Sequence, residues 1–155
     1  MKSDNSSGTM LVAFDGSPSS LAALNWAVEK APLLYMDIYL VHVWEYSESS
    51  IDIAAVGFGS AGYVGEGDPK VWSEQILSNA LSSLPAEKSA GIRTGSIEGG
   101  VVKTLVELSK EAQLMVMGSR GHGKLADLIL GSVSESCSAK SKCPVLIVHA
   151  PVAAN

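Results

Sequence analysis

Alternation of short apolar runs with segments of helical periodicity is the feature that most constrains the fold of this chain. Four runs are apolar almost throughout: Thr9–Phe14, Asp37–Trp44, Leu114–Met117 and Val145–Val148. Such runs are typical of strands that are covered on both faces of a sheet. Ile92–Ile97 is a weaker run that contains Gly95, and we predict it as an edge strand.

Between these runs, three segments carry apolar residues at the spacing of one helix face, and a fourth, Ser132–Lys142, is predicted as a helix of modest intrinsic propensity. The predicted helices are Pro18–Ala31, Lys70–Leu84, Gly100–Ala112 and Ser132–Lys142. Ser17 suits the N-cap of the first helix, and Pro18 suits its first position, where the missing N–H would have no partner. The expected buried stripes are Leu21, Leu24, Val28 and Ala31 in the first helix and Val71, Trp72, Ile76, Leu77, Ala80, Leu81 and Leu84 in the second.

Strands that alternate with helices through short links pair in parallel by right-handed crossovers. We therefore expect an α/β domain with an open five-stranded parallel sheet and helices on both faces. In such sheets, ligands bind beyond the carboxyl ends of the strands, where the strand order reverses. Candidate functional residues are accordingly those that follow the first, second and fourth strands.

The composition predicts one globular domain. The chain has 155 residues, of which 46% are hydrophobic and 17% charged, and we place the domain at residues 9–150 with tails at 1–8 and 151–155. No apolar run is long enough to cross a bilayer, and the polar start MKSDNSSGTM does not resemble a secretory signal, so we expect a cytoplasmic protein. A formal net charge of -5 argues against nucleic acid as a partner.

Cysteine and histidine do not indicate a metal site. Cys137 and Cys143 form no C-x-x-C pair, and His122 and His149 lack metal-ligand spacing, so we predict buried cysteines and no protein metal cage. His42 is interpreted as a packed strand residue. Tyr46–Pro69 is rich in glycine and is predicted to be a long connection.

Two glycine motifs match nucleotide-binding patterns only by spelling. Gly57, Gly59 and Gly62 form G-x-G-x-x-G, but the motif lies in the glycine-rich connection and does not join a first strand to a helix. Gly118–Lys124 spells G-x-x-x-x-G-K, but Leu125 stands where a P-loop needs a hydroxyl for magnesium. We therefore disfavour a dinucleotide enzyme and a P-loop NTPase.

A third pattern begins at the end of the fourth strand and finishes at a helix start. Gly118, Gly121, Gly131 and Ser132 fit G-x2-G-x9-G-[ST]. Glycines allow close approach of the backbone N–H groups to an anion, and a helix N-terminus attracts negative charge. The spacing predicts a phosphate site, although tight turns would also use these glycines. Asp15 can accept hydrogen bonds from ribose or adenine, or can serve the Asp-Gly turn.

Five segments, spread over nearly the whole chain, carry a family resemblance: VAFDGSPSS, LVHVW, VMGSRGHG, GSVSE and CPVLIV. In these segments the sequence resembles the ATP-binding subclass of the universal stress protein family. The resemblance implies a Rossmann-like, adenine nucleotide alpha hydrolase-like fold with strand order 3-2-1-4-5. It also implies ATP as the ligand, with Mg or Mn carried by the phosphates. The implied binding residues are Asp15, Val43, Met117, Gly118, Arg120, Gly121, His122, Gly123, Gly131, Ser132, Val133 and Ser134.

The resemblance further implies a nucleotide-responsive regulatory module that acts on an unidentified protein partner. It implies a homodimer through Pro144–His149, the last strand. The alternatives are a slow ATPase or a protein that phosphorylates itself on Ser132 or Ser134, a nucleotide-free universal stress protein, and a flavodoxin-like mononucleotide carrier. No catalytic residue is assigned, because no general base is evident near the glycines.

Overall fold

The computed structural model describes residues 7–46, 67–121 and 130–151. The strands are β1 (Gly8–Ala13), β2 (Met36–Trp44), β3 (Arg93–Glu98), β4 (Leu114–Gly118) and β5 (Val145–Val148), and the helices are α1 (Pro18–Lys30), η1 (Pro32–Leu34), α2 (Pro69–Ser82), α3 (Ala86–Ser89), α4 (Val101–Leu108) and α5 (Ser132–Lys140). Among these residues, no helix is long and apolar enough to cross a membrane.

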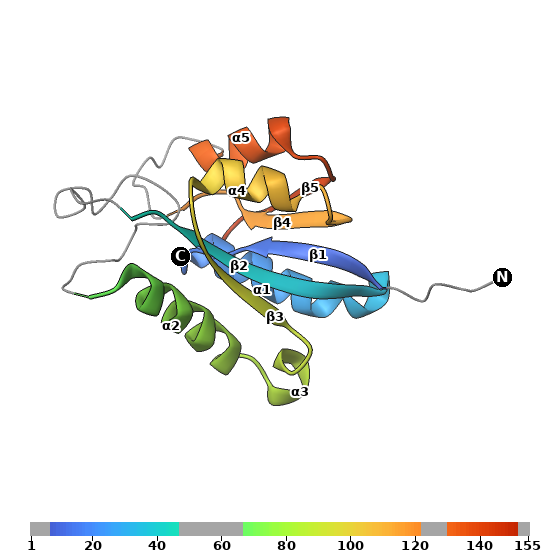
Figure 1. Ribbon diagram of the computed structural model, residues 1–155. Helices are drawn as coiled ribbons and strands as arrows, with labels where there is room; N and C mark the ends of the chain where they lie inside the picture. Colours follow the sequence, from blue (N-terminus) through green and yellow to red (C-terminus); the bar gives the residue numbers. More distant parts are fainter. Residues whose placement is uncertain (1–6, 47–66, 122–129, 152–155) are drawn as a thin grey trace.

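All the strands form one parallel sheet in the order β3-β2-β1-β4-β5 (Figure 1). β1 pairs with β2 from Gly8↔Met36 to Ala13↔Val41, and with β4 on its other side. The strand order therefore reverses at β1: β2 and β3 are added on one side of it, and β4 and β5 on the other. The predicted fold class, parallel pairing and strand order are confirmed, including the edge position of β3.

Side chains of alternate strand residues build a separate core on each face of the sheet. Met10, Val12 and Leu40 pack with α1 and α2, whereas Leu11, Val41 and Met115 pack with α4 and α5. Because β1 is covered on both faces, its residues from Met10 onward are all buried. This explains why the central strands are apolar runs and not alternating ones.

Helix α1 begins as the sequence predicts. The Ser17 side chain accepts a hydrogen bond from the Ser20 backbone N–H at 3.2 Å, and Pro18 occupies the first turn. Its buried stripe is rotated from the predicted one, because Ser19 and Ser20 are buried and Leu21 is 40% exposed. The stripe predicted for α2 also needs correction at Val71, which is 58% exposed, while Ser73 is buried. In both helices, polar contacts described below hold the serines inward.

The structure differs from the predicted elements mainly at their ends. β1 and β2 each begin one residue earlier, and α4 ends at Leu108 where a helix to Ala112 was predicted. There the Ser109 hydroxyl donates to the Val106 carbonyl at 2.6 Å and its oxygen accepts from the Lys142 N–H at 2.9 Å. These bonds end the helix one turn early and tie it to the chain after α5.

Candidate functional site

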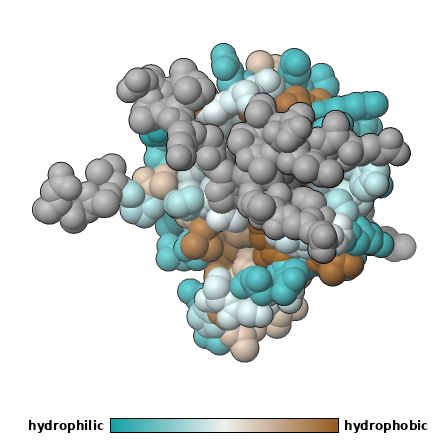
Figure 2. Space-filling view, turned by 90° about the vertical axis from the view of Figure 1, so that its left-hand side faces the viewer, coloured by the Kyte–Doolittle hydropathy of each residue, from teal (hydrophilic) through white to brown (hydrophobic). Residues whose placement is uncertain are grey.

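The predicted site lies at the edge of the sheet where β1, β2 and β4 end. Figure 2 views the molecule from this end, where apolar residues reach the surface above helix α2. Asp15 follows β1, Val43 is near the end of β2, and Met117 is near the end of β4. The Phe14 N–H donates to the Val41 carbonyl at 2.8 Å, which continues the β1–β2 pairing up to this edge. The topology thus brings the three predicted residues to one end of adjacent strands.

Asp15 is only 1% exposed and takes part in the turn into α1. Its Oδ1 accepts a hydrogen bond from the Ser17 backbone N–H at 2.8 Å, and Gly16 between them has φ 80°. Glycine adopts this left-handed conformation without steric cost. The Asp-Gly turn role considered from the sequence is therefore present in the structure.

Val43 and Met117 belong to the buried core on the α4–α5 side of the sheet. Their side chains are 1% and 0% exposed, respectively. Both side chains therefore lie below the surface of this edge.

Gly118 is constrained by packing against α1. A Cβ added at Gly118 would overlap the Ser19 hydroxyl and would lie 2.7 Å from both the Ser19 carbonyl carbon and the Ser20 backbone nitrogen. Because backbone atoms cannot move aside without shifting the helix, only glycine fits here. The glycine spacing predicted that Gly118 serves anion binding, and the structure shows that close packing against α1 also requires a glycine here.

Two serines of the α1 N-terminus hold the chain that follows Gly118. The Ser19 hydroxyl donates to the Arg120 carbonyl, and the Ser17 hydroxyl lies 3.4 Å from the same oxygen. The Arg120 N–H in turn lies 3.4 Å from the Ser19 hydroxyl oxygen. This role of Ser19 was not predicted, because its burial and its contact with Arg120 are apparent only from the structure.

Gly131 closes the other side of the site. Its N–H donates to the Ser119 carbonyl at 2.7 Å, so Gly131 lies against the start of the loop that follows β4, although the two residues are distant in sequence. A Cβ at Gly131 would lie 3.4 Å from the Arg120 Cα and 3.7 Å from the Gly121 nitrogen, which are ordinary contact distances. A side chain could therefore be placed here, but it would fill the space beside the Gly121 N–H.

Helix α5 starts at this point without a side-chain cap. Gly131 is its N-cap, and within the described ranges no side chain accepts a hydrogen bond from the first turn. Ser132 is exposed and Val133 is half-buried. The first N–H groups of α5 and the positive end of its dipole are therefore directed toward the region of Gly121.

Ser134 lies beneath the loop and supports it. Its hydroxyl is buried and lies 2.7 Å from the Gly118 carbonyl and 3.2 Å from the Ser119 carbonyl. These contacts connect α5 to the end of β4. The hydroxyl thus faces the protein, in contrast to the exposed residue Ser132.

The remaining predicted residues, His122 and Gly123, lie outside the described residues, as does most of the Tyr46–Pro69 connection. The structure brings together Gly118, Arg120, Gly121 and the start of α5, and it places Asp15, Val43 and Met117 at the same edge. A cavity of about 400 Å³ opens on the α1 side of the loop, lined by Pro18, Ser19, Ser119, Arg120, Gly121, His149 and Ala150. It shares the loop with the predicted site but does not include Asp15, Val43 or Met117.

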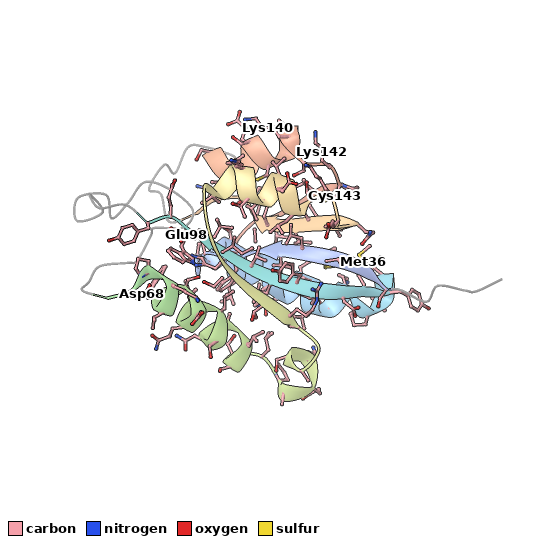
Figure 3. All side chains as sticks on the ribbon, viewed as in Figure 1. Met36, Asp68, Glu98, Lys140, Lys142 and Cys143 are labelled. Carbon is pink, nitrogen blue, oxygen red and sulfur yellow. The ribbon has the colours of Figure 1, made fainter. Side chains whose placement is uncertain are left out.

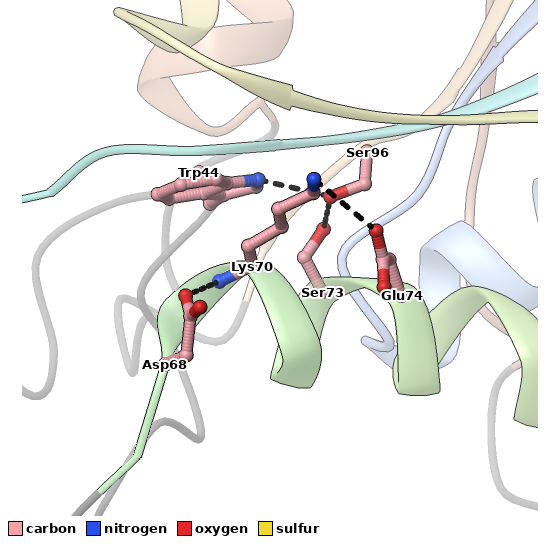
Figure 4. Close-up of polar contacts among 6 residues, drawn as sticks. All are labelled: Trp44, Asp68, Lys70, Ser73, Glu74 and Ser96. Carbon is pink, nitrogen blue, oxygen red and sulfur yellow. Dashed lines mark hydrogen bonds and ion pairs between the residues drawn. The ribbon is translucent and has the colours of Figure 1, made fainter.

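A buried polar network lies behind the end of β2 (Figure 4). The Trp44 indole N–H donates to the Ser96 hydroxyl at 2.9 Å, and the Ser96 hydroxyl donates to the Ser73 hydroxyl at 2.7 Å. Ser73 lies 2.7 Å from Nδ1 of His42. The network joins α2 to β2 and β3, and it explains why Ser73 faces inward on an otherwise apolar stripe.

The ring of His42 is held at Nδ1 by this hydrogen bond, and the direction of donation between Nδ1 and the Ser73 hydroxyl depends on the imidazole tautomer. Nε2 is buried and has no hydrogen-bond partner among the described residues. Burial lowers the pKa of His42 from 6.5 to about 4, so the ring is neutral at physiological pH. The Trp72 ring packs edge-on against it, with centroids 5.3 Å apart.

Both cysteines are free. Cys137 is fully buried, and burial raises the pKa of its thiol to about 11, partly offset by the positive charge of Lys140. Burial also raises the pKa of the half-buried Cys143. Among the described residues, no three His, Cys, Asp or Glu side chains are grouped so that they could hold a metal ion.

The sequence profile of the universal stress protein family matches residues 7–149 of the chain. The chain belongs to this family. It is 35% identical over 145 residues to the universal stress protein YxiE of Bacillus subtilis, covering 90% of this chain and 97% of YxiE. It is 30% identical over 151 residues to a universal stress protein of Mycobacterium tuberculosis, covering 90% of this chain and 47% of the relative. The chain thus spans about half the length of the mycobacterial relatives.

Solved structures of universal stress proteins share the fold. One is described in complex with cAMP. It is 26% identical to this chain with a TM-score of 0.64, and the match covers 94% of this chain and 100% of that structure. Another is from Arabidopsis thaliana and is described with AMP bound. It is 19% identical to this chain with a TM-score of 0.61, and the match covers 94% of this chain and 93% of that structure. The resemblance to the universal stress protein family is confirmed, whereas the ATP-binding subclass stays a prediction. Two of the structural relatives are described with adenine nucleotides.

Proposed function

We propose that this universal stress protein binds ATP at the edge formed by β1, β2, β4 and α5 and acts as a nucleotide-responsive regulatory module. The observation that carries the proposal is the placement of Gly131 against Arg120 and Gly121, beside an α5 N-terminus whose N-cap residue has no side chain. The space next to the Gly121 N–H is one that a Cβ at residue 131 would fill. A phosphate group fits such a cradle chemically.

Several weak contacts act together in this proposal. The N–H groups of Gly121, Ser132 and Val133 would donate to phosphate oxygens, with Arg120, His122 and Gly123 close in sequence. The helix dipole contributes only about 0.3–1 kcal/mol, so most of the affinity has to come from the sum of the amide contacts. A divalent cation, Mg or Mn, would be carried by the phosphates and not by a protein cage.

The nucleoside would lie toward β1 and β2. Asp15 offers a carboxylate for the ribose hydroxyls or the adenine amine, and its turn contact with Ser17 fixes its orientation. Val43 and Met117 would form the floor beneath the base, with main-chain groups of Val43 available to adenine edges. The nucleotides named for the two structural relatives, cAMP and AMP, share the adenosine part of ATP.

The same proposal includes a homodimer and a cytoplasmic location. β5 is an edge strand whose residues Val145–Val148 are all half-buried, and such an edge needs a cover. A second copy paired through Pro144–His149 would supply it. Sedimentation at micromolar concentration should then give a species of twice the 16.1 kDa mass, and a monomer would contradict this part. Free cysteines are typical of a reducing compartment.

The competing function is enzymatic, with slow ATP hydrolysis or transfer of the γ-phosphoryl group to a serine. Ser132 is the better acceptor because it is exposed, whereas the Ser134 hydroxyl is buried against Gly118. Incubation with ATP and magnesium, followed by nucleotide analysis and intact-mass measurement, separates the possibilities. We expect bound ATP, negligible ADP and no added phosphate. Turnover or phosphorylation that is lost in Ser132→Ala would establish the enzyme instead.

A further inference from the structure

A second distinctive surface lies at the opposite end of the sheet, where the strands begin. Between α1 and β2, the η1 turn and the residue after it present three consecutive large apolar side chains to solvent: Leu33 at 69%, Leu34 at 46% and Tyr35 at 84% exposure. Met36, the first residue of β2, marks this end in Figure 3, far from Asp68 at the other. We name Leu33, Leu34 and Tyr35 the apolar turn.

Tyr35 occupies a backbone conformation that favours glycine. Its φ of 54° and ψ of 46° are left-handed, and it is the one non-glycine residue with positive φ in the described part of the chain. For an L-residue with a bulky side chain, this conformation costs about 1–2 kcal/mol. The Tyr35 carbonyl accepts from the Gly8 N–H at 3.2 Å, so the turn itself is needed to start β2 beside β1. The aromatic ring, being almost fully exposed, gains little from packing in this chain.

A groove of about 430 Å³ adjoins the apolar turn. It lies between the end of α1, the start of β2 and α3, and its apolar floor includes Val28, Ala31, Ile38 and Ile92. Pro32 and Met36 line the groove and flank the apolar turn on both sides in sequence. The apolar turn therefore adjoins the lining of the groove along the chain.

The charges around the groove are mostly negative. Glu29, Asp37 and Glu87 line it together with one cation, Lys88. Asp37 accepts a hydrogen bond from the Ser7 hydroxyl at 2.7 Å. Within the described ranges, Glu29 and Glu87 make neither an ion pair nor a side-chain hydrogen bond. Two of the three carboxylates are thus available to cations from outside.

We propose that the groove and the apolar turn together form a docking surface for a basic amphipathic segment of a partner protein. Apolar side chains of the partner would enter the groove and cover Leu33 and Tyr35, and its Lys or Arg residues would pair with Glu29 and Glu87. Rim charges of this kind accelerate association and select partners more than they add affinity. The surface is at the opposite end from the nucleotide site, so this inference does not depend on ATP binding.

The test uses two matched synthetic probes: a short amphipathic peptide of leucine and lysine, and the same peptide with glutamate in place of lysine. Binding to the isotopically labelled full chain is followed by amide chemical shifts and by fluorescence anisotropy. We expect the lysine peptide to bind and to shift amides between Val28 and Ile38 and between Glu87 and Ile92. The glutamate peptide should bind at least roughly tenfold more weakly.

Variants separate specific docking from general attraction to an acidic protein. Tyr35→Asn removes the ring while asparagine tolerates the left-handed backbone, so it should weaken the lysine peptide roughly tenfold without lowering the unfolding midpoint. Tyr46→Asn makes the same change at the other end of β2 and should leave binding unchanged. Glu29→Gln combined with Glu87→Gln should reduce the dependence of lysine-peptide binding on salt concentration.

Three outcomes would overturn the proposal. The first is equal binding of both peptides, and the second is shifts confined to other parts of the molecule or insensitive to Tyr35→Asn. The third is concentration-dependent self-association of the wild-type chain that Tyr35→Asn abolishes, because the occupant would then be a second copy of the chain.

Discussion

Gly118 and Gly131 flank the same loop, but different constraints act on them. Gly118 is packed against the α1 backbone, whereas Gly131 has φ −74° and room for a methyl group. We predict that Gly118→Ala lowers the free energy of unfolding by about 1–3 kcal/mol, because the Ser19–Ser20 backbone has to shift. Urea unfolding monitored by circular dichroism measures this. Equal stability of Gly118→Ala and the wild type would show that α1 does not constrain this residue.

His42 gives the fold a specific pH dependence. Its pKa is lowered by burial from 6.5 to about 4, so the unfolded chain takes up a proton below pH 6.5 that the folded chain does not. Stability should therefore fall as the pH decreases from about 6.5 to about 4. Because one pKa unit corresponds to about 1.36 kcal/mol, the full loss is about 3 kcal/mol.

The measurement for His42 is the free energy of unfolding as a function of pH in the wild type and in His42→Gln. The other titratable groups are present in both proteins and cancel in the difference. The wild type should lose stability more steeply than the variant across this pH range. Parallel curves would contradict a buried, neutral His42.

At the scale of elements, the sequence predicted all five strands and the four helices of eight or more residues. Burial on both faces leaves apolar runs in the central strands, and burial on one face leaves a helical stripe in α1, α2 and α4. The sequence did not predict α3 or η1, which are each less than five residues long. The rotation of the α1 stripe was also missed. Ser19 donates a hydrogen bond to the Arg120 carbonyl, which is distant in sequence, and Ser20 bonds to the nearby Asp15 and Ser17. Periodicity carries no signal for such contacts.

The connection between α5 and β4 can be tested with a pair of serines on one helix. The Ser134 hydroxyl is buried against the Gly118 carbonyl, whereas the Ser138 hydroxyl, one turn later, donates to the Ser134 carbonyl of the same helix at 2.7 Å. We predict that Ser134→Ala costs about 1–3 kcal/mol, because the Gly118 and Ser119 carbonyls lose a buried donor. Ser138→Ala should cost less. Thermal unfolding compares the two, and equal losses would argue against the connection.

At the scale of the whole molecule, two surfaces of different character lie at opposite ends of the strands. The carboxyl end carries the glycine loop and the α5 N-terminus, and the amino end carries the apolar turn with its acidic groove. The sequence pointed to the first through glycine spacing. It gave no indication of the second, because that surface depends on the exposure of Leu33 and Tyr35 and on the position of α3. The part of the predicted site at His122 and Gly123 remains a prediction.

Nucleotide binding should stabilise the whole fold, since the proposed site would be assembled from β1, β4, α5 and the turn into α1. A ligand that binds only the folded chain, present at 100 times its Kd, raises the free energy of unfolding by about 2.7 kcal/mol. We predict this increase with ATP. Urea unfolding with and without ATP measures it, with Gly118→Ala excluded because it alters stability itself. An unchanged midpoint at saturating ATP would contradict a site built across these elements.

The most direct test of the ATP site is a calorimetric titration of ATP with magnesium into three proteins: the wild type, Gly131→Ala and Gly100→Ala. Gly100 is the matched control, because it is also a glycine N-cap without a side-chain cap, and a Cβ there meets nothing within 4 Å. We predict that the wild type and Gly100→Ala bind ATP equally. Gly131→Ala should bind at least roughly tenfold more weakly, a loss of about 1.4 kcal/mol. No binding by the wild type, or undiminished binding by Gly131→Ala, would contradict the assignment of the phosphate site.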